Sequence, residues 1–208
     1  MNTHETNSLK KTKVLVGMAI FTALVVVLQQ MAGIIKIGPF TPSLVLIPIV
    51  IGAAVYGAKA GAWLGLVFSV CVMIAVITGQ DAGGYLMWGI NPAMTAAIVL
   101  VKGIAAGFLA GLVFRALEQK NQLIATVAAA IVCPLVNTGL FLVGTLAVFQ
   151  PLLNEWAEGW RAATGNAGAS LGTYLIVGMV GLNFLVELGI NLVLSPVVVR
   201  ILKIRKVA

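Results

Sequence analysis

The sequence predicts an all-α integral membrane protein, a bundle of six transmembrane helices with both termini in the cytoplasm. Its composition indicates the class, because 61% of the 208 residues are hydrophobic, 9% are charged and the mean hydropathy is +1.09. The net charge of +7 does not indicate nucleic-acid binding. The basic residues lie at the ends of apolar runs, where they indicate topology within a lipid bilayer.

The apolar runs form one transmembrane domain, residues 1–208, after a polar cytoplasmic tail of residues 1–13. The first run is too long for a signal-peptide core, and the second is short and contains Pro48. The expected spans are residues 14–35, 44–56, 62–78, 91–117, 123–149 and 171–199. Residues 57–61 are expected to form a tight turn, and residues 79–88 a glycine-rich loop that carries aromatic residues.

The second half of the chain adds three local signals. Asn91 and Pro92 suit the cap and first turn of the fourth span, while Asn137 and Thr138 put polar groups in the middle of the fifth. Residues 150–170 combine tryptophans with charges. This pattern predicts a short amphipathic helix at the membrane surface.

The distribution of lysine and arginine predicts the orientation. With cytoplasmic termini, ten basic residues lie inside, two lie outside and Lys102 lies within the membrane. The inside residues are Lys10, Lys11, Lys13, Lys59, Arg115, Lys120, Arg200, Lys203, Arg205 and Lys206, and the outside residues are Lys36 and Arg161. The opposite orientation would reverse a strong positive-inside bias.

The last span carries the most unusual motif of the chain. Asn183, Glu187 and Asn191 lie four residues apart, which places them on one helix face. A carboxylate in hydrocarbon costs about 3 kcal/mol, so Glu187 should face the bundle interior and have a partner. Lys102 is the candidate partner. Two interpretations stay open: a structural Lys102–Glu187 ion pair with amides that join helices, or the floor of a polar ligand cavity.

Motifs for catalysis are missing from the sequence. It contains no Walker A motif, nucleophile elbow or metal-ligand cluster, and its single histidine, His4, lies in the polar tail. We therefore expect no catalytic residues, no metal, no cofactor and no enzyme activity. A self-contained channel or secondary transporter is an alternative, but the two halves show no inverted repeat and little intramembrane charge. A purely structural membrane subunit is another.

The first span contains Ala19 and Ala23, small residues four apart that permit close helix approach. With the basic N-terminus, the six spans and the short inner turns, this pattern resembles the substrate-binding S-component of an energy-coupling factor (ECF) vitamin transporter. The resemblance implies docking of Ala19 and Ala23 onto a transmembrane coupling protein driven by two cytoplasmic ATPase subunits. It also implies a bacterial plasma-membrane location. Residues 46–52, 57–61 and 136–140 look most like the branch that includes pantothenate carriers.

Within this resemblance, polar and aromatic residues near the outer half are candidates for binding the vitamin. They are Lys36, Tyr85, Trp88, Asn91, Asn137, Thr138, Arg161 and Asn183. An anion such as pantothenate would favour a cation, either Lys36, Lys102 or Arg161. A cationic pyridoxamine or thiamin would favour Asp81 or Glu187, and pyridoxine, folate and riboflavin are further alternatives. The aromatic residues could equally anchor the protein at the interface, and Asn137 could equally join helices.

Overall fold

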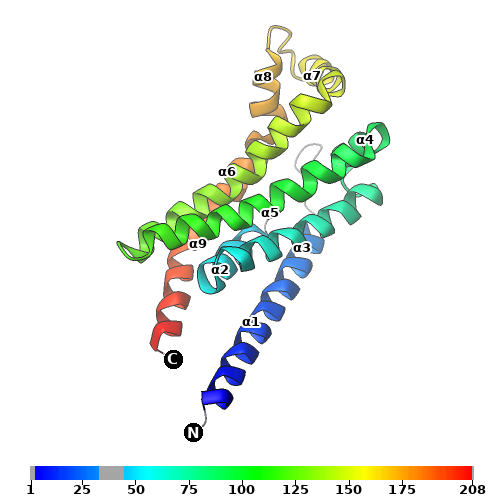
Figure 1. Ribbon diagram of the computed structural model, residues 1–208. Helices are drawn as coiled ribbons and strands as arrows, with labels where there is room; N and C mark the ends of the chain where they lie inside the picture. The colour runs from blue at the N-terminus through cyan, green and yellow to red at the C-terminus, as the bar shows by residue number, and fades with distance from the viewer. Residues whose placement is uncertain (1–2, 33–44, 208) are drawn as a thin grey trace.

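The computed structural model describes residues 3–32 and 45–207, with side chains described for residues 11–32 and 45–200. Every regular element in these ranges is a helix (Figure 1). The elements are α1 (Thr3–Ala32), α2 (Leu46–Tyr56), α3 (Ala58–Ile77), α4 (Ala82–Ile90), α5 (Pro92–Leu117), α6 (Gln122–Val148), α7 (Gln150–Thr164), α8 (Leu171–Thr173), the π-helix η1 (Tyr174–Val180) and α9 (Gly181–Val207). The all-helical class is thereby confirmed.

Within the described residues, five stretches are long and apolar enough to cross a membrane, so the chain is a multi-pass membrane protein. They lie in α1, α3, α5, α6 and the continuous run from Leu171 to Arg200. The predicted span 44–56 corresponds to α2, whose 11 residues extend only about 16 Å at about 1.5 Å per residue. The count of six spans and the cytoplasmic position of the termini therefore stay predictions. Figure 1 shows the ends of the chain at one end of the bundle and α7 and α8 at the other.

The predicted loop over residues 79–88 was wrong, because α4 begins at Ala82. The helix starts there because Asp81 acts as its N-cap, with Oδ1 accepting a hydrogen bond of 2.8 Å from the Gly84 N–H. Gly83 and Gly84 are buried, which lets α4 pack against α3 and α5. Glycine content indicated a loop, whereas the cap and the close packing determined a helix.

The predicted helix within residues 150–170 is confirmed as α7, which buries Leu152, Leu153 and Ala157. The last span differs from the uniform helix expected, because it contains the π-helix η1. A Cβ at Gly181 would collide with the Ile176 carbonyl oxygen. Glycine at this position therefore accommodates the wider π turn that leads into α9.

Helices α3 and α5 meet along a seam of glycines, defined here as Gly61 and Gly65 on α3 with Gly103, Gly107 and Gly111 on α5. A Cβ at Gly61 would collide with the Gly107 carbonyl oxygen, and a Cβ at Gly65 with that of Gly103. The two backbones therefore touch, as small residues at intervals of four allow in a membrane. This α3–α5 seam forms the centre of the bundle.

Helix α1 lies at the edge of the bundle and packs against α2 and α3 (Figure 1). Only 11% of its most apolar stretch is buried, against at least 22% in each of the other four candidate spans. Its inner face carries Met18, Thr22, Val25 and Gln29 at helical spacing, and Val25 is fully buried in the main apolar core. The opposite side of α1 is exposed and apolar.

Candidate functional site

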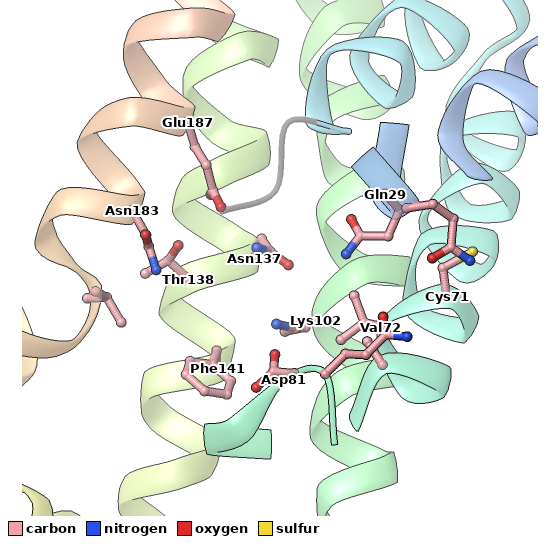
Figure 2. Close-up of a pocket in the computed structure, with 14 residues that line it drawn as sticks. Gln29, Cys71, Val72, Asp81, Lys102, Asn137, Thr138, Phe141, Asn183 and Glu187 are labelled. Carbon is pink, nitrogen blue, oxygen red and sulfur yellow. The ribbon is translucent and has the colours of Figure 1, made fainter. Parts of the chain in front are cut away.

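A polar cavity lies inside the bundle, between α1 and α3 on one side and α6 and α9 on the other (Figure 2). Its described lining residues come from five stretches that are distant in the sequence. They are Gln29, Gln30, Cys71, Val72, Ala75, Gln80, Asp81, Lys102, Asn137, Thr138, Phe141, Val180, Asn183 and Glu187. Its volume is about 60 Å³, whereas pockets for drug-sized ligands measure roughly 300–1,000 Å³. A ligand of vitamin size must widen the cavity on binding.

Lys102 projects into this cavity from α5. It precedes Gly103, where a Cβ would collide with Ser69 Oγ, so the α3–α5 seam fixes the backbone that carries the lysine. Its Nζ lies 4.7 Å from the centroid of the Phe141 ring, within the range of a cation–π interaction. Asp81 and Glu187 both lie near enough to act electrostatically on the ammonium group. The described lining of the cavity thus contains one ammonium group and two carboxyl groups.

Asp81 lies between α3 and α4, where it both caps α4 and lines the cavity. Burial raises the pKa of its carboxyl group above the ordinary range, while the Gly84 N–H and the positive charge of Lys102 partly offset this rise. Figure 2 shows the carboxylate on the side of the cavity where Lys102 and Phe141 lie. The N-cap residue of α4 therefore also places a carboxyl group beside the lysine.

Amide groups line the remaining walls. Asn137 and Thr138 come from α6, Asn183 comes from α9, and Gln29 comes from α1 (Figure 2). Within residues 11–32 and 45–200, no hydrogen bond reaches Gln29 Oε1 or Asn137 Oδ1, although both atoms are buried. A buried acceptor without a donor is unfavourable, and more so where water is scarce. These two oxygens are available to a bound molecule that supplies donors.

The chain matches a known protein family over nearly its whole length. The pattern of the ECF transporter substrate-specific component matches residues 13–199. The chain belongs to this family. Comparison with curated proteins and with solved structures gave no match. The family and the polar cavity together make the chain the substrate-specific subunit of an ECF importer, a transport subunit rather than an ATPase.

The structure brings together only part of the site predicted for this ECF subunit. Asn137, Thr138 and Asn183 line the cavity. Lys102 and Glu187 line it as well, from α5 and α9, so the two residues of the expected ion pair face the same space. Direct pairing between them stays a prediction, since Asp81 also interacts with the lysine.

Four other predicted residues do not line this cavity. On α4, Tyr85 is 51% exposed and Trp88 packs against the main apolar core. Asn91 caps α5 by accepting a hydrogen bond from the backbone N–H of residue 94, and Arg161 donates one from Nε to the carbonyl oxygen of residue 169. Lys36 lies outside the described residues. Asn91 and Arg161 therefore make local structural contacts.

Several cavity residues were missed from the sequence, namely Gln29, Gln30, Gln80 and Phe141. Gln29 and Gln30 had a signal, because adjacent amides inside an apolar span are costly unless they meet polar groups. Phe141 had none, since an aromatic residue in an apolar helix most often packs in a core. In the described part of the chain, no group of three histidine, cysteine, aspartate or glutamate side chains could hold a metal ion.

The other predicted surface of the ECF subunit is the Ala19–Ala23 face of α1. Both alanines are exposed. Large exposed apolar residues lie beside them, including Leu15 at 71% and Ile20 at 56% exposure. Small residues on an exposed helix face are compatible with close approach of another helix, and docking at this face stays a prediction.

Proposed function

We propose that this ECF subunit binds a small water-soluble vitamin in the polar cavity, with pantothenate as the leading candidate. The cavity supports this proposal because it combines amide groups with a single ammonium group among its described lining residues. Pantothenate carries one carboxylate together with hydroxyl and amide groups. Pyridoxamine, pyridoxine, thiamin, folate and riboflavin are the alternatives, and the two carboxyl groups of the cavity would favour the cationic members of this group.

In the proposed complex, Lys102 interacts with the ligand carboxylate and also with the Glu187 carboxylate across the cavity. An ammonium group has three donors, so it can serve a ligand and a protein carboxylate together. Glu187 then has a structural role, which is to hold the lysine between α5 and α9. The amides of Asn137 and Asn183, with the Thr138 hydroxyl, bind the uncharged part of the vitamin.

Release of the vitamin is proposed to depend on separate subunits. These are the ECF transmembrane coupling protein and two cytoplasmic ATPases, which family membership implies as a module and whose identity it leaves open. The exposed Ala19–Ala23 face of α1 is the proposed docking surface. Cytoplasmic termini would place most basic residues inside a bacterial plasma membrane, in agreement with the positive-inside rule.

Mass spectrometry of small molecules that remain with the purified chain tests this function. We expect one of the named vitamins, released on denaturation, and no ATP hydrolysis by the isolated chain. Intrinsic ATP turnover, or uptake in cells that lack every coupling subunit, would overturn the proposal. Recovery of a different vitamin would replace pantothenate without changing the mechanism.

A further inference from the structure

Helix α1 reaches the cavity through one side chain of its inner face. Gln29 is 8% exposed and follows Val25 and Thr22 along the face that packs on the bundle. Thr22 is held by Trp63 of α3, whose Nε1 donates a hydrogen bond of 3.2 Å to Thr22 Oγ1. Figure 2 shows the Gln29 amide pointing into the cavity toward Asn137.

The hydrogen bonding of Gln29 differs from that of the buried hydroxyl residues. Ser69, Thr145 and Ser195 each donate to a backbone carbonyl oxygen, at 2.8 Å in every case. Gln29 Oε1 has no hydrogen-bond donor within the described ranges, and the same holds for Asn137 Oδ1 across the cavity. A residue that joins helices would be satisfied by its neighbours. Two unsatisfied oxygens from separate helices that line one cavity instead indicate a place for a ligand.

We propose that Gln29, together with Asn137, binds hydroxyl or amide N–H groups of the transported molecule, so that occupation of the cavity holds α1 against the bundle. This inference rests on the proposed function. Gln29 lies six residues beyond Ala23, about 9 Å along the helix axis at about 1.5 Å per residue. The ligand contact and the exposed alanine face are therefore parts of one rigid helix, and α1 can transmit the state of the cavity to a docked subunit.

The test compares the wild-type chain with Gln29→Met and with Asn191→Leu. Both exchanges remove a buried amide group that has an unsatisfied atom, but Asn191 does not line the cavity. Purified proteins are titrated with pantothenate, pyridoxamine, pyridoxine, thiamin, folate and riboflavin, and their melting temperatures are recorded without ligand. We expect Gln29→Met to weaken binding of the recognised vitamin at least about tenfold, because a donor of the vitamin loses its acceptor.

The ligand-free melting temperature separates a binding role from a structural one. We expect the ligand-free melting temperature of Gln29→Met to equal or exceed that of the wild type, because the exchange removes an unsatisfied buried amide. Asn191→Leu should leave vitamin binding unchanged. A clearly lower melting temperature of Gln29→Met, or binding within about twofold of wild type, overturns the role of Gln29. Wild-type protein that binds none of the vitamins contradicts the proposed substrate class, and this inference with it.

Discussion

Helix α1 and the α3–α5 seam, which support the cavity from different sides of the bundle, are built in opposite ways. Along the seam, Gly61 and Gly107 bring two backbones into contact, and Ser69 Oγ donates a hydrogen bond of 2.8 Å to the Val99 carbonyl oxygen. Along α1, most of the surface is exposed, and Gln29 keeps an acceptor without a donor in the described ranges. The seam is close-packed and satisfied, whereas α1 is loosely packed and unsatisfied.

This difference indicates separate roles for α1 and for the α3–α5 seam. A seam that admits no additional atom holds Lys102 in a fixed position, because core packing resists even small changes in volume. Helix α1 is less buried than the other candidate spans, so we expect this helix to supply the widening that a vitamin requires in a cavity of about 60 Å³. We therefore expect the seam to stabilise the fold and to position the Lys102 charge. We expect α1 to open the cavity and to dock onto another subunit.

The largest effect is expected from breaking the seam. Gly107→Ala places a Cβ against the Gly61 carbonyl oxygen and should destabilise the protein by about 3 kcal/mol. Gly139→Ala on α6 is the matched control, because no atom lies within 4 Å of its added Cβ. This control should be neutral or stabilising by up to about 1 kcal/mol through helix propensity. Unfolding in detergent measures both, and equal stability of the two variants would show that the seam is not a close contact.

A second prediction tests α1 as a docking surface. Ala23→Trp should lower vitamin uptake by cells roughly tenfold and leave binding by the isolated chain unchanged, since a bulky residue blocks close helix approach. Leu24→Trp is the control, because Leu24 is also exposed and lies about 100° around the helix from Ala23. Loss of binding in parallel with uptake would assign Ala23 to internal packing.

The smallest effect concerns Asp81, the N-cap residue of α4 that lies beside Lys102 in the cavity. Because burial raises the pKa of Asp81, the folded chain keeps a proton that the unfolded chain releases above pH of about 4. The free energy of unfolding should therefore fall as pH rises from there through the raised pKa. Asp81→Asn retains a capping oxygen for α4 but has no carboxyl group to titrate. Its free energy of unfolding should therefore fall less steeply over this pH range. Glu158→Gln on the exposed face of α7 is the control, and an unchanged slope in Asp81→Asn would refute the assignment.

The sequence predicted much of the fold because membrane helices depend mainly on local composition. Apolar runs located the long helices, and Asn91 with Pro92 located the start of α5. The failure at α4 has a physical cause, since the Asp81 cap and the packing of Gly84 involve neighbours that composition does not reveal. The seam was missed although Gly103, Gly107 and Gly111 repeat every four residues, because such spacing gains meaning only when the facing helix is known.

The site was less predictable than the fold. Spacing by four placed Asn183 and Glu187 on one face of α9, and both line the cavity. The contribution of α1 and of Asp81 depends on how distant helices pack, which periodicity within one helix cannot give. Tyr85 and Asn91 show the converse case, because both have side chains suited to binding and lie near a span end. Tyr85 is exposed and does not line the cavity, and Asn91 caps α5.

Binding to a blocked cavity tests the central claim most directly. The measurement is equilibrium binding of radiolabelled pantothenate, with the other vitamins as competitors, to wild-type protein, Asn137→Phe and Gly139→Phe. Asn137→Phe places a ring in the cavity, whereas the Cβ of Gly139→Phe on the same helix has no atom within 4 Å, and residue 139 does not line the cavity. We predict a single bound vitamin molecule for the wild type and Gly139→Phe, and none for Asn137→Phe. Undiminished binding by Asn137→Phe would show that the vitamin binds elsewhere and would contradict the account.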